Sequence, residues 1–123
     1  MSLSMLVGVQ RIFLMPFAEV YPAYVNKVER KQRSVDELNQ VILWLTGFTE
    51  NEFQQQLKSQ CTIEEFFGAA RINPNASLIT GSVCGVKIQE IDDPLMLKIR
   101  YLDKLVDELA KGRPMEKILR SGA

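Results

Sequence analysis

The residue types that most often carry enzyme chemistry are scarce in this chain. It contains no histidine and only two cysteines, Cys61 and Cys84. Histidine is the side chain that most often transfers protons near neutral pH, and it is also the commonest metal ligand. The sequence therefore closes off most general-base, zinc and triad chemistry. It predicts no catalytic residue, no metal site and no cofactor.

A polar group in the last third of the chain supports one chemical alternative. Cys84 is a candidate nucleophile, but without histidine its thiolate would need stabilisation by Lys87, Arg100 or a helix terminus. Tyr101 can donate a hydrogen bond into a cleft beside Arg100 and Asp103. The candidate ligand-binding residues of a small-ligand protein or an enzyme are thus Cys84, Arg100, Tyr101 and Asp103. The structural alternative makes Cys84 a small buried hydrophobic residue.

Acidic residues form a second group with potential chemistry. Asp103 and Asp107 are four positions apart on one predicted helical face, a spacing that could present oxygen ligands to a divalent cation. Three more carboxylates, Glu90, Asp92 and Asp93, precede that helix. We favour a helix N-cap followed by a solvated, salt-bridged face.

A basic cluster lies in the first third of the chain. It consists of Lys27, Arg30, Lys31 and Arg33, with Glu29 among them. These side chains could hold phosphate groups of a nucleic acid near the start of the next helix. No groove-reading element accompanies them, so we favour a role at a helix end and keep nucleic-acid binding as an alternative.

Composition indicates one globular domain spanning residues 1–123. Apolar residues make up 46% and charged residues 24%, and fifteen basic residues balance fifteen acidic ones, so no global field favours nucleic acid or an anionic membrane. The two separated cysteines form no disulfide framework, which favours the cytoplasm. Residues 1–5 resemble a leader or cloning scar before a second start at Met5. The apolar stretch 6–17 predicts neither a signal peptide nor a membrane span.

Three capping boxes mark helix starts in the middle of the chain. Ser34, Thr49 and Thr62 are each followed three residues later by glutamate. The pattern predicts a helix over 35–46, ended by Gly47, and short helices over 50–59 and 63–71.

The carboxyl-terminal third predicts a longer helix. Asp93 is a predicted N-cap, Pro94 occupies the first helical position, and apolar residues repeat at helical spacing for about eighteen residues until Gly112. A short helix follows Pro114. Upstream, one helical face contains Pro22, which predicts either one kinked helix, slightly favoured, or a new helix starting there. Residues 77–91 predict an extended or hairpin segment.

Several sequence words together resemble a known bacterial family. They are FAEVYP (17–22), YV (24–25), WLTG (44–47), NP (73–74), VCGV (83–86), DPLM (93–96) and IRYLDKLVDELAKG (99–112). In this order, over about residues 11–120, they resemble a family catalogued as a domain of unknown function, number twenty-two hundred. The resemblance implies a small, mainly helical bacterial protein. It implies no activity, cofactor or catalytic residue.

We therefore expect a mainly α fold: a compact orthogonal bundle of five or six helices with one short extended or hairpin segment near residues 77–91. The predicted core consists of Val41, Ile42, Trp44, Leu45, Ile99, Leu102, Val106 and Leu109. By elimination, the leading functional hypothesis is a noncatalytic protein-interaction or regulatory module that works through a homo-oligomer or a protein partner, with no membrane involved.

Overall fold

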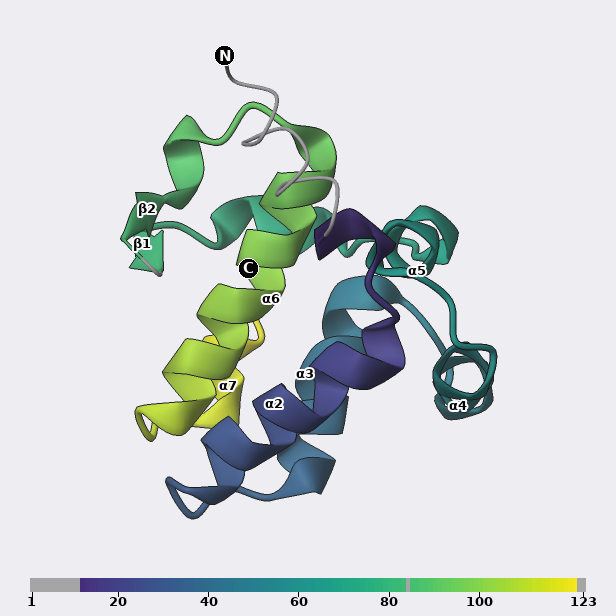
Figure 1. The fold of residues 1–123 in the computed structure, drawn as a ribbon. Helices are drawn as coiled ribbons and strands as arrows, with labels where there is room; N and C mark the ends of the chain where they lie inside the picture. Colours follow the sequence, from purple (N-terminus) through teal and green to yellow (C-terminus); the bar gives the residue numbers. More distant parts are fainter. Residues whose placement is uncertain (1–11, 84, 122–123) are drawn as a thin grey trace.

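Helices make up most of this protein, and a long helix near its carboxyl end contacts most of the others. The structure is a computed structural model that describes residues 12–83 and 85–121. Its elements are α2 (Phe17–Glu29), α3 (Val35–Thr46), α4 (Glu50–Lys58), α5 (Ile63–Ala69), η1 (Pro74–Leu78), β1 (Ser82–Val83), β2 (Val86–Lys87), η2 (Ile88–Glu90), α6 (Pro94–Ala110) and α7 (Met115–Ile118). α6 packs against α2, α3 and α7, whereas α4 and α5 are seen nearly end-on (Figure 1). The predicted mainly helical, compact fold is confirmed.

The three predicted capping boxes are all present. Backbone N–H groups of Glu37, Glu52 and Glu65 donate to the side chains of Ser34, Thr49 and Thr62, each at 3.1 Å. Each glutamate carboxylate in turn accepts a hydrogen bond from the backbone N–H of its N-cap residue. These reciprocal bonds satisfy amides that have no partner inside the helix, which is why α3, α4 and α5 begin where the sequence predicts.

The end of α3 also follows the prediction, with a tertiary reason added. Gly47 has φ 72°, and its N–H donates to the carbonyl of Leu43 at 2.9 Å. The backbone at Arg71 crosses the end of α3 here, and its N–H donates to the Thr46 carbonyl at 2.7 Å. This crossing also accompanies the end of α5 at Ala69, two residues before the predicted limit.

Proline lies inside α2 rather than at the start of a helix. α2 is one helix from Phe17 to Glu29, and Pro22 is exposed within it. The alternative in which a new helix begins at Pro22 is therefore wrong. Only the buried edge of α2 faces the core, through Phe17, Val28 and half-buried residues between them.

The segment after α5 forms the predicted hairpin, but a shorter one than residues 77–91. β1 and β2 pair antiparallel, with Ser82 opposite Lys87 and Val83 opposite Val86. Two 3₁₀ turns, η1 and η2, occupy the flanking residues. Val83 and Ile88 are buried, so the hairpin packs against the helices through them.

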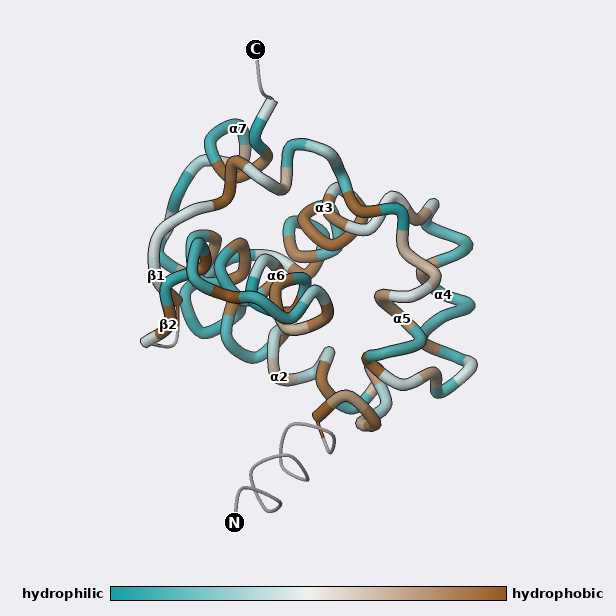
Figure 2. The backbone as a smooth tube through the Cα atoms, turned by 90° about the horizontal axis from the view of Figure 1, so that it is seen from above, coloured by the Kyte–Doolittle hydropathy of each residue, from teal (hydrophilic) through white to brown (hydrophobic). Residues whose placement is uncertain are grey.

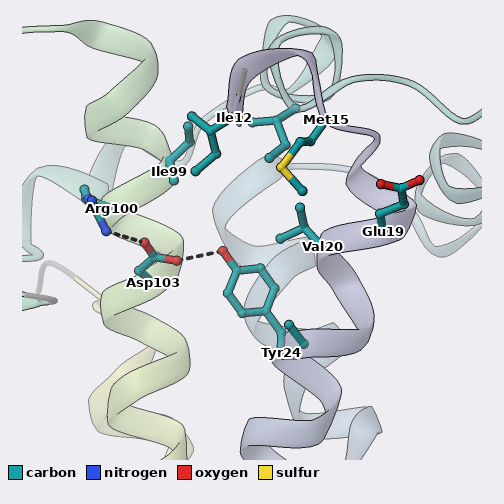
Figure 3. A pocket seen from close by; sticks show the side chains of 10 residues that line it. Ile12, Met15, Glu19, Val20, Tyr24, Ile99, Arg100 and Asp103 are labelled. Atoms are coloured by element: carbon teal, nitrogen blue, oxygen red, sulfur yellow. Dashed lines mark hydrogen bonds and ion pairs between the residues drawn. The ribbon is translucent and has the colours of Figure 1, made fainter. Parts of the chain in front are cut away.

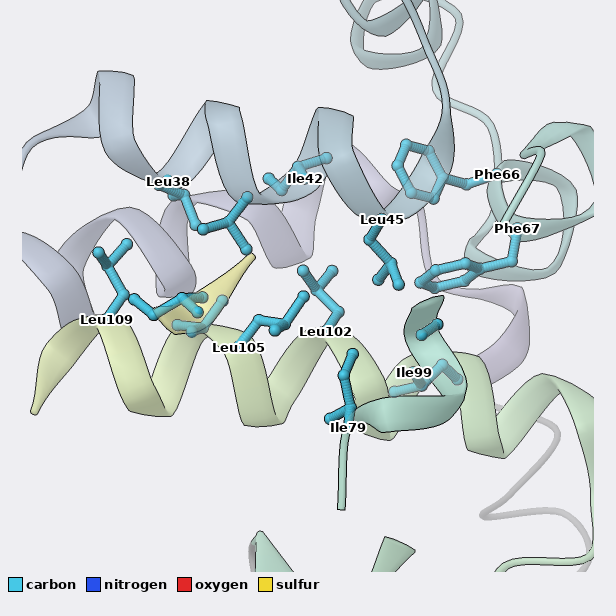
Figure 4. Packing of buried hydrophobic residues seen from close by; sticks show 14 of the residues in the cluster. Leu38, Ile42, Leu45, Phe66, Phe67, Ile79, Ile99, Leu102, Leu105 and Leu109 are labelled. Atoms are coloured by element: carbon cyan, nitrogen blue, oxygen red, sulfur yellow. The ribbon is translucent and has the colours of Figure 1, made fainter. Parts of the chain in front are cut away.

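The core lies mainly between α3 and α6. Their facing side chains, drawn in Figure 4, are Leu38, Ile42 and Leu45 of α3 and Leu102, Leu105 and Leu109 of α6. Seven of the eight predicted core residues are buried: Val41, Ile42, Leu45, Ile99, Leu102, Val106 and Leu109. Trp44 is the exception. It lies beside the buried stripe of α3 and is only half-buried.

An aromatic cluster extends this core toward α4 and α5. The rings of Phe17 and Phe66 stack with centroids 3.8 Å apart, and Phe66 meets Phe67 edge-on at 5.2 Å. α4 contributes one buried residue, Phe53, and its tube is largely hydrophilic in Figure 2. The cluster therefore joins the start of α2 to α5, an arrangement that shapes the site described next.

Within the described part of the chain, no helix combines the length and the apolar character needed to cross a lipid bilayer.

Candidate ligand site between α2 and α6

A pocket of about 350 Å³ opens between α2 and the first half of α6 (Figure 3). Most of its wall is apolar. Six of its ten lining residues are aliphatic or methionine, namely Ile12, Met15, Val20, Ala23, Ile63 and Ile99. The other four are Glu19, Tyr24, Arg100 and Asp103. Apolar walls with a few convergent polar groups are the usual composition of a small-molecule site.

Backbone pairing holds the upper wall of this pocket in place. Pro16 forms an isolated antiparallel bridge with Thr62. On either side of it, the Phe17 N–H donates to the Cys61 carbonyl at 2.9 Å, and the Ile63 N–H donates to the Met15 carbonyl at 2.8 Å. These bonds fix the start of α2 against the start of α5. Met15 and Ile63, which come from distant parts of the chain, consequently line the same wall.

The polar end of the pocket is built around the carboxylate of Asp103. Its Oδ1 accepts a hydrogen bond from the Tyr24 hydroxyl at 2.7 Å, and its Oδ2 accepts one from Nη1 of Arg100 at 3.1 Å. Figure 3 shows both interactions side by side, with Tyr24 reaching across from α2. Asp103 is therefore held from both helices.

One buried donor of Arg100 stays without a partner in this arrangement. Its Nε is buried and has no hydrogen-bond partner among residues 12–83 and 85–121. The side chain as a whole is 25% exposed, so the guanidinium lies at the boundary between the pocket wall and solvent. Buried donors are normally satisfied, so this N–H is an exception within the fold.

The structure unites two of the four predicted ligand-binding residues. Arg100 and Asp103 both line the pocket, as i and i+3 neighbours on α6. Tyr101, one position away, is half-buried against the core and is not among the lining residues. Cys84 lies outside the described residues. The predicted polar trio is thus divided between two faces of α6, because successive helical residues point in different directions.

Tyr24 and the apolar wall were not predicted as site residues. Tyr24 is recognisable in the sequence as part of an apolar helical face, but its partner Asp103 is 79 positions away. No local spacing carries that information. The wall residues have ordinary hydrophobic character and give no signal that separates a pocket from a packed core.

Half of the predicted basic cluster is engaged within the fold. Nζ of Lys27 lies 3.4 Å from Oδ1 of Asp107. Arg33 pairs with Glu37 at 2.9 Å and also donates to the carbonyls of Leu109 and Arg113, at 3.1 and 2.8 Å. Arg33 therefore caps the carboxyl end of α6, which is the structural role that the sequence favoured.

The remaining two members of the cluster face solvent. Arg30 and Lys31 are exposed, and neither forms an ion pair with the described residues.

The pairing of Arg33 with Glu37 lowers the pKa of the Glu37 carboxyl to about 2, through the Arg33 hydrogen bonds first and then the Ser34 backbone N–H.

The acidic residues do not converge on a cation site. Asp93 accepts a hydrogen bond from the Met96 N–H at 2.8 Å, as the predicted N-cap of α6. Asp107 binds Lys111 at 3.0 Å as well as Lys27; burial acts to raise its pKa, but these two cations outweigh it and lower the pKa. Across residues 12–83 and 85–121, no three Cys, Asp or Glu side chains are grouped closely enough to hold a metal ion.

Cys61 is the free cysteine of the described chain. It is half-buried, and its Sγ contacts the Gln56 carbonyl at 3.4 Å and the Gln56 side-chain oxygen at 3.1 Å. Burial raises the pKa of this thiol. A raised pKa disfavours the reactive thiolate form of this side chain.

Comparison with known proteins gives the chain a family. Residues 11–120 match the family described as "Uncharacterized protein conserved in bacteria (DUF2200)". The crystal structure of the uncharacterized protein SP1917 is 45% identical to this chain, with a TM-score of 0.83, and the match covers 89% of this chain and 91% of that one. A search of curated proteins gave no match. The resemblance predicted from the sequence is therefore confirmed, and the chain belongs to the bacterial family DUF2200.

Proposed function

We propose that this protein binds a small, largely apolar molecule in the pocket between α2 and α6. The observation that carries the proposal is the composition of that pocket: six apolar lining residues and one polar end formed by Tyr24, Asp103 and Arg100. Its volume of about 350 Å³ lies within the range of small-molecule sites, which is about 300 to 1,000 Å³. The proposal makes the second alternative from the sequence, a small-ligand protein, the leading one.

Binding fits the pocket better than catalysis does. The Asp103 carboxylate is occupied by Tyr24 and Arg100, so it is poorly placed to act as a general base. Glu19 lies at the exposed rim of the pocket rather than in its interior. We therefore infer a binding or regulatory role without a chemical step.

A neutral fluorescent probe, N-phenyl-1-naphthylamine, tests the proposal directly. Its emission rises when it leaves water for an apolar site. We expect saturable binding to the natural protein and at least tenfold weaker binding to Ala23→Phe, because Ala23 lines the pocket and a phenyl ring there occupies the ligand volume. Equal, unsaturable fluorescence from both proteins would reject the pocket as the site.

The matched control adds the same side chain outside the pocket. Glu29→Phe lies on the same helix at an exposed position that does not line the pocket. It should bind the probe as the natural protein does. Circular dichroism of all three proteins establishes that the helices are intact.

The interaction-module hypothesis is the second candidate. Two large hydrophobic side chains are notably exposed on the described surface, Leu14 at 63% and Leu78 at 47%. Such residues can belong to a contact with a partner or a second copy. Sedimentation equilibrium tests whether the protein associates with itself. Self-association that Leu14→Ser or Leu78→Ser abolishes would support an interaction role. A monomer at high concentration would count against a homo-oligomer.

A further inference from the structure

We infer that a basic end of the helix bundle binds the phosphate backbone of double-helical nucleic acid. The basic end consists of residues 27–33, between the last turn of α2 and the start of α3, and residues 107–113, between the last turn of α6 and the start of α7. Figure 1 shows both turns at the lower end of the molecule. Neither segment lines the pocket between α2 and α6, so the two sites can be tested separately.

Arg33 joins the two segments of the basic end. Its side chain is only 15% exposed, and its Nη1 donates to the Arg113 carbonyl, 80 positions away, at 2.8 Å. Lys27 also reaches the end of α6, where it shares the Asp107 carboxylate with Lys111. Cations from two distant parts of the chain therefore lie on one surface. The local spacing of residues 27–33 gives no sign of the second segment.

The basic end carries an excess of positive charge. It contains six basic and three acidic residues, although the whole chain has no net charge. Lys27 and Lys111 share a single carboxylate, and Arg30 and Lys31 form no ion pair with the described residues. The carboxyl ends of α2 and α6 each contribute roughly half a negative charge, which still leaves the surface positive. An anionic partner would be attracted to this end.

The other side chains of the basic end favour nucleic acid over different anionic partners. Its apolar residues, Val28, Leu109 and Ala110, are all buried. Protein interfaces usually centre on exposed apolar or aromatic anchors, and membrane-bound helices insert such residues, so neither partner finds an anchor here. Single strands usually stack their bases on aromatic side chains, and the two segments contain none. The phosphates of a double helix need only exposed cations.

Titration of a fluorescein-labelled 20-base-pair DNA duplex with the full-length chain tests the inference by fluorescence anisotropy. We expect affinity to fall roughly fortyfold between 50 and 200 mM KCl, because counterion release from about three phosphates gives a slope of about −2.7 in log K against log salt. Base sequence should have no effect, since phosphate contacts carry no sequence information. No binding by about 100 μM protein at 50 mM KCl would overturn the inference.

Two pairs of substitutions locate the binding surface. Arg30→Gln with Lys31→Gln removes two exposed cations, so it should weaken binding at least tenfold at 50 mM KCl and reduce the slope to about −0.9. Lys58→Gln with Lys87→Gln is the matched control, because it makes the same change in net charge at exposed positions on α4 and β2. The control should bind like the natural protein. Equal losses would trace binding to net charge alone and overturn the assignment to the basic end.

A third variant should act in the opposite direction. Glu29 is exposed at the basic end and forms no ion pair with the described residues. Glu29→Gln removes its repulsion of phosphate and should strengthen duplex binding about threefold at 50 mM KCl, with a steeper salt dependence. Unchanged or weaker binding would contradict the inference, provided that circular dichroism shows intact helices.

Competitors identify the class of anion. A DNA duplex and an RNA duplex of equal length both present paired phosphate rows, and the one that competes better identifies the source of the backbone. Polyglutamate of equal total charge should compete at least tenfold less well, because its charges are less dense than those of a duplex and release fewer counterions. Equal competition by polyglutamate would overturn the inference in favour of an acidic protein. Tighter binding of a single strand than of either duplex would also overturn it.

Discussion

Tyr24 and Asp103 link the two helices that form the pocket, by a hydrogen bond of 2.7 Å between residues 79 positions apart. The hydroxyl donates, and the carboxylate that accepts is held on its other side by Arg100. This bond lies at the polar end of the pocket and joins α2 to α6 at the same point. The pocket and the packing of these two helices therefore share this contact.

Removing the Tyr24 hydroxyl should show how much its hydrogen bond to Asp103 stabilises the fold. We expect Tyr24→Phe to lower the free energy of unfolding by about 1 kcal/mol, because a partly buried hydrogen bond is lost while the ring stays. Urea denaturation provides the measurement. Tyr101→Phe is the control, since the Tyr101 hydroxyl has no hydrogen bond to any described residue. Equal effects of the two variants would contradict the role given to the Tyr24–Asp103 bond.

The α3–α6 core should be sensitive to truncation of its central leucine. Leu102 is 1% exposed, so Leu102→Ala should cost about 2 to 5 kcal/mol through lost burial and the cavity left behind. Leu14→Ala should change stability by less than about 0.5 kcal/mol, because Leu14 is 63% exposed. A loss below about 0.5 kcal/mol for Leu102→Ala would show that the residue is not part of the core.

Gly47 and Gly112 both have positive φ, but only Gly47 lies close to another backbone segment, at Arg71. Alanine at the two positions therefore tests how tightly the segments pack there. At Gly47, with φ 72°, an added Cβ would lie 2.6 Å from the Arg71 carbonyl oxygen. At Gly112, with φ 90°, the same atom would meet nothing within 4 Å. Both Gly→Ala changes incur the left-handed penalty of about 1 to 2 kcal/mol. We expect Gly47→Ala to cost at least about 1 kcal/mol more than Gly112→Ala in thermal or urea unfolding, whereas equal costs would show that the backbone at Arg71 moves aside.

The buried carboxylate of Glu108 should be essential for attaching the carboxyl-terminal segment. Glu108 is 4% exposed and accepts hydrogen bonds from Arg113 at 3.0 Å and from Arg120 at 2.6 and 2.8 Å. Glu108→Ala removes the shared partner of both arginines and should destabilise the protein by about 3 kcal/mol. Hydrogen exchange should show early opening of α7, and the exposed control Glu116→Ala should show neither effect.

Acid stability should report the pairing of Glu37 with Arg33. The folded-state pKa of Glu37 is about 2, below its ordinary value of 4.5, so the group stabilises the fold above pH 4.5. That contribution is lost as pH falls from about 4.5 toward 2. Glu37→Gln should therefore lower stability at pH 6 and flatten the stability profile over this window, measured by urea unfolding at a series of pH values. An unchanged slope would contradict the lowered pKa.

Local sequence signals predicted the helix boundaries well because the interactions that set them are local. Capping boxes join residues three positions apart, and the Asp93-Pro94 start of α6 depends only on its first turn. The same signals missed details decided at long range. α5 ends at Ala69 beside the crossing of Arg71 over α3, and Trp44 lies at the edge of the core because α3 buries only one stripe against α6.

The residues of the candidate site also divide into those predicted from local spacing and those brought in by long-range contacts. Arg100 and Asp103 were predicted together because they are neighbours on one helix, whereas Tyr24 and the walls formed by Met15 and Ile63 were not. By itself, the sequence determined the helical class, the helix starts, the hairpin and the family, since these depend on local propensity and on the order of short motifs. Only the tertiary structure decided which helices pack together, which charges are neutralised and where a pocket opens, because these depend on contacts between residues far apart in the chain.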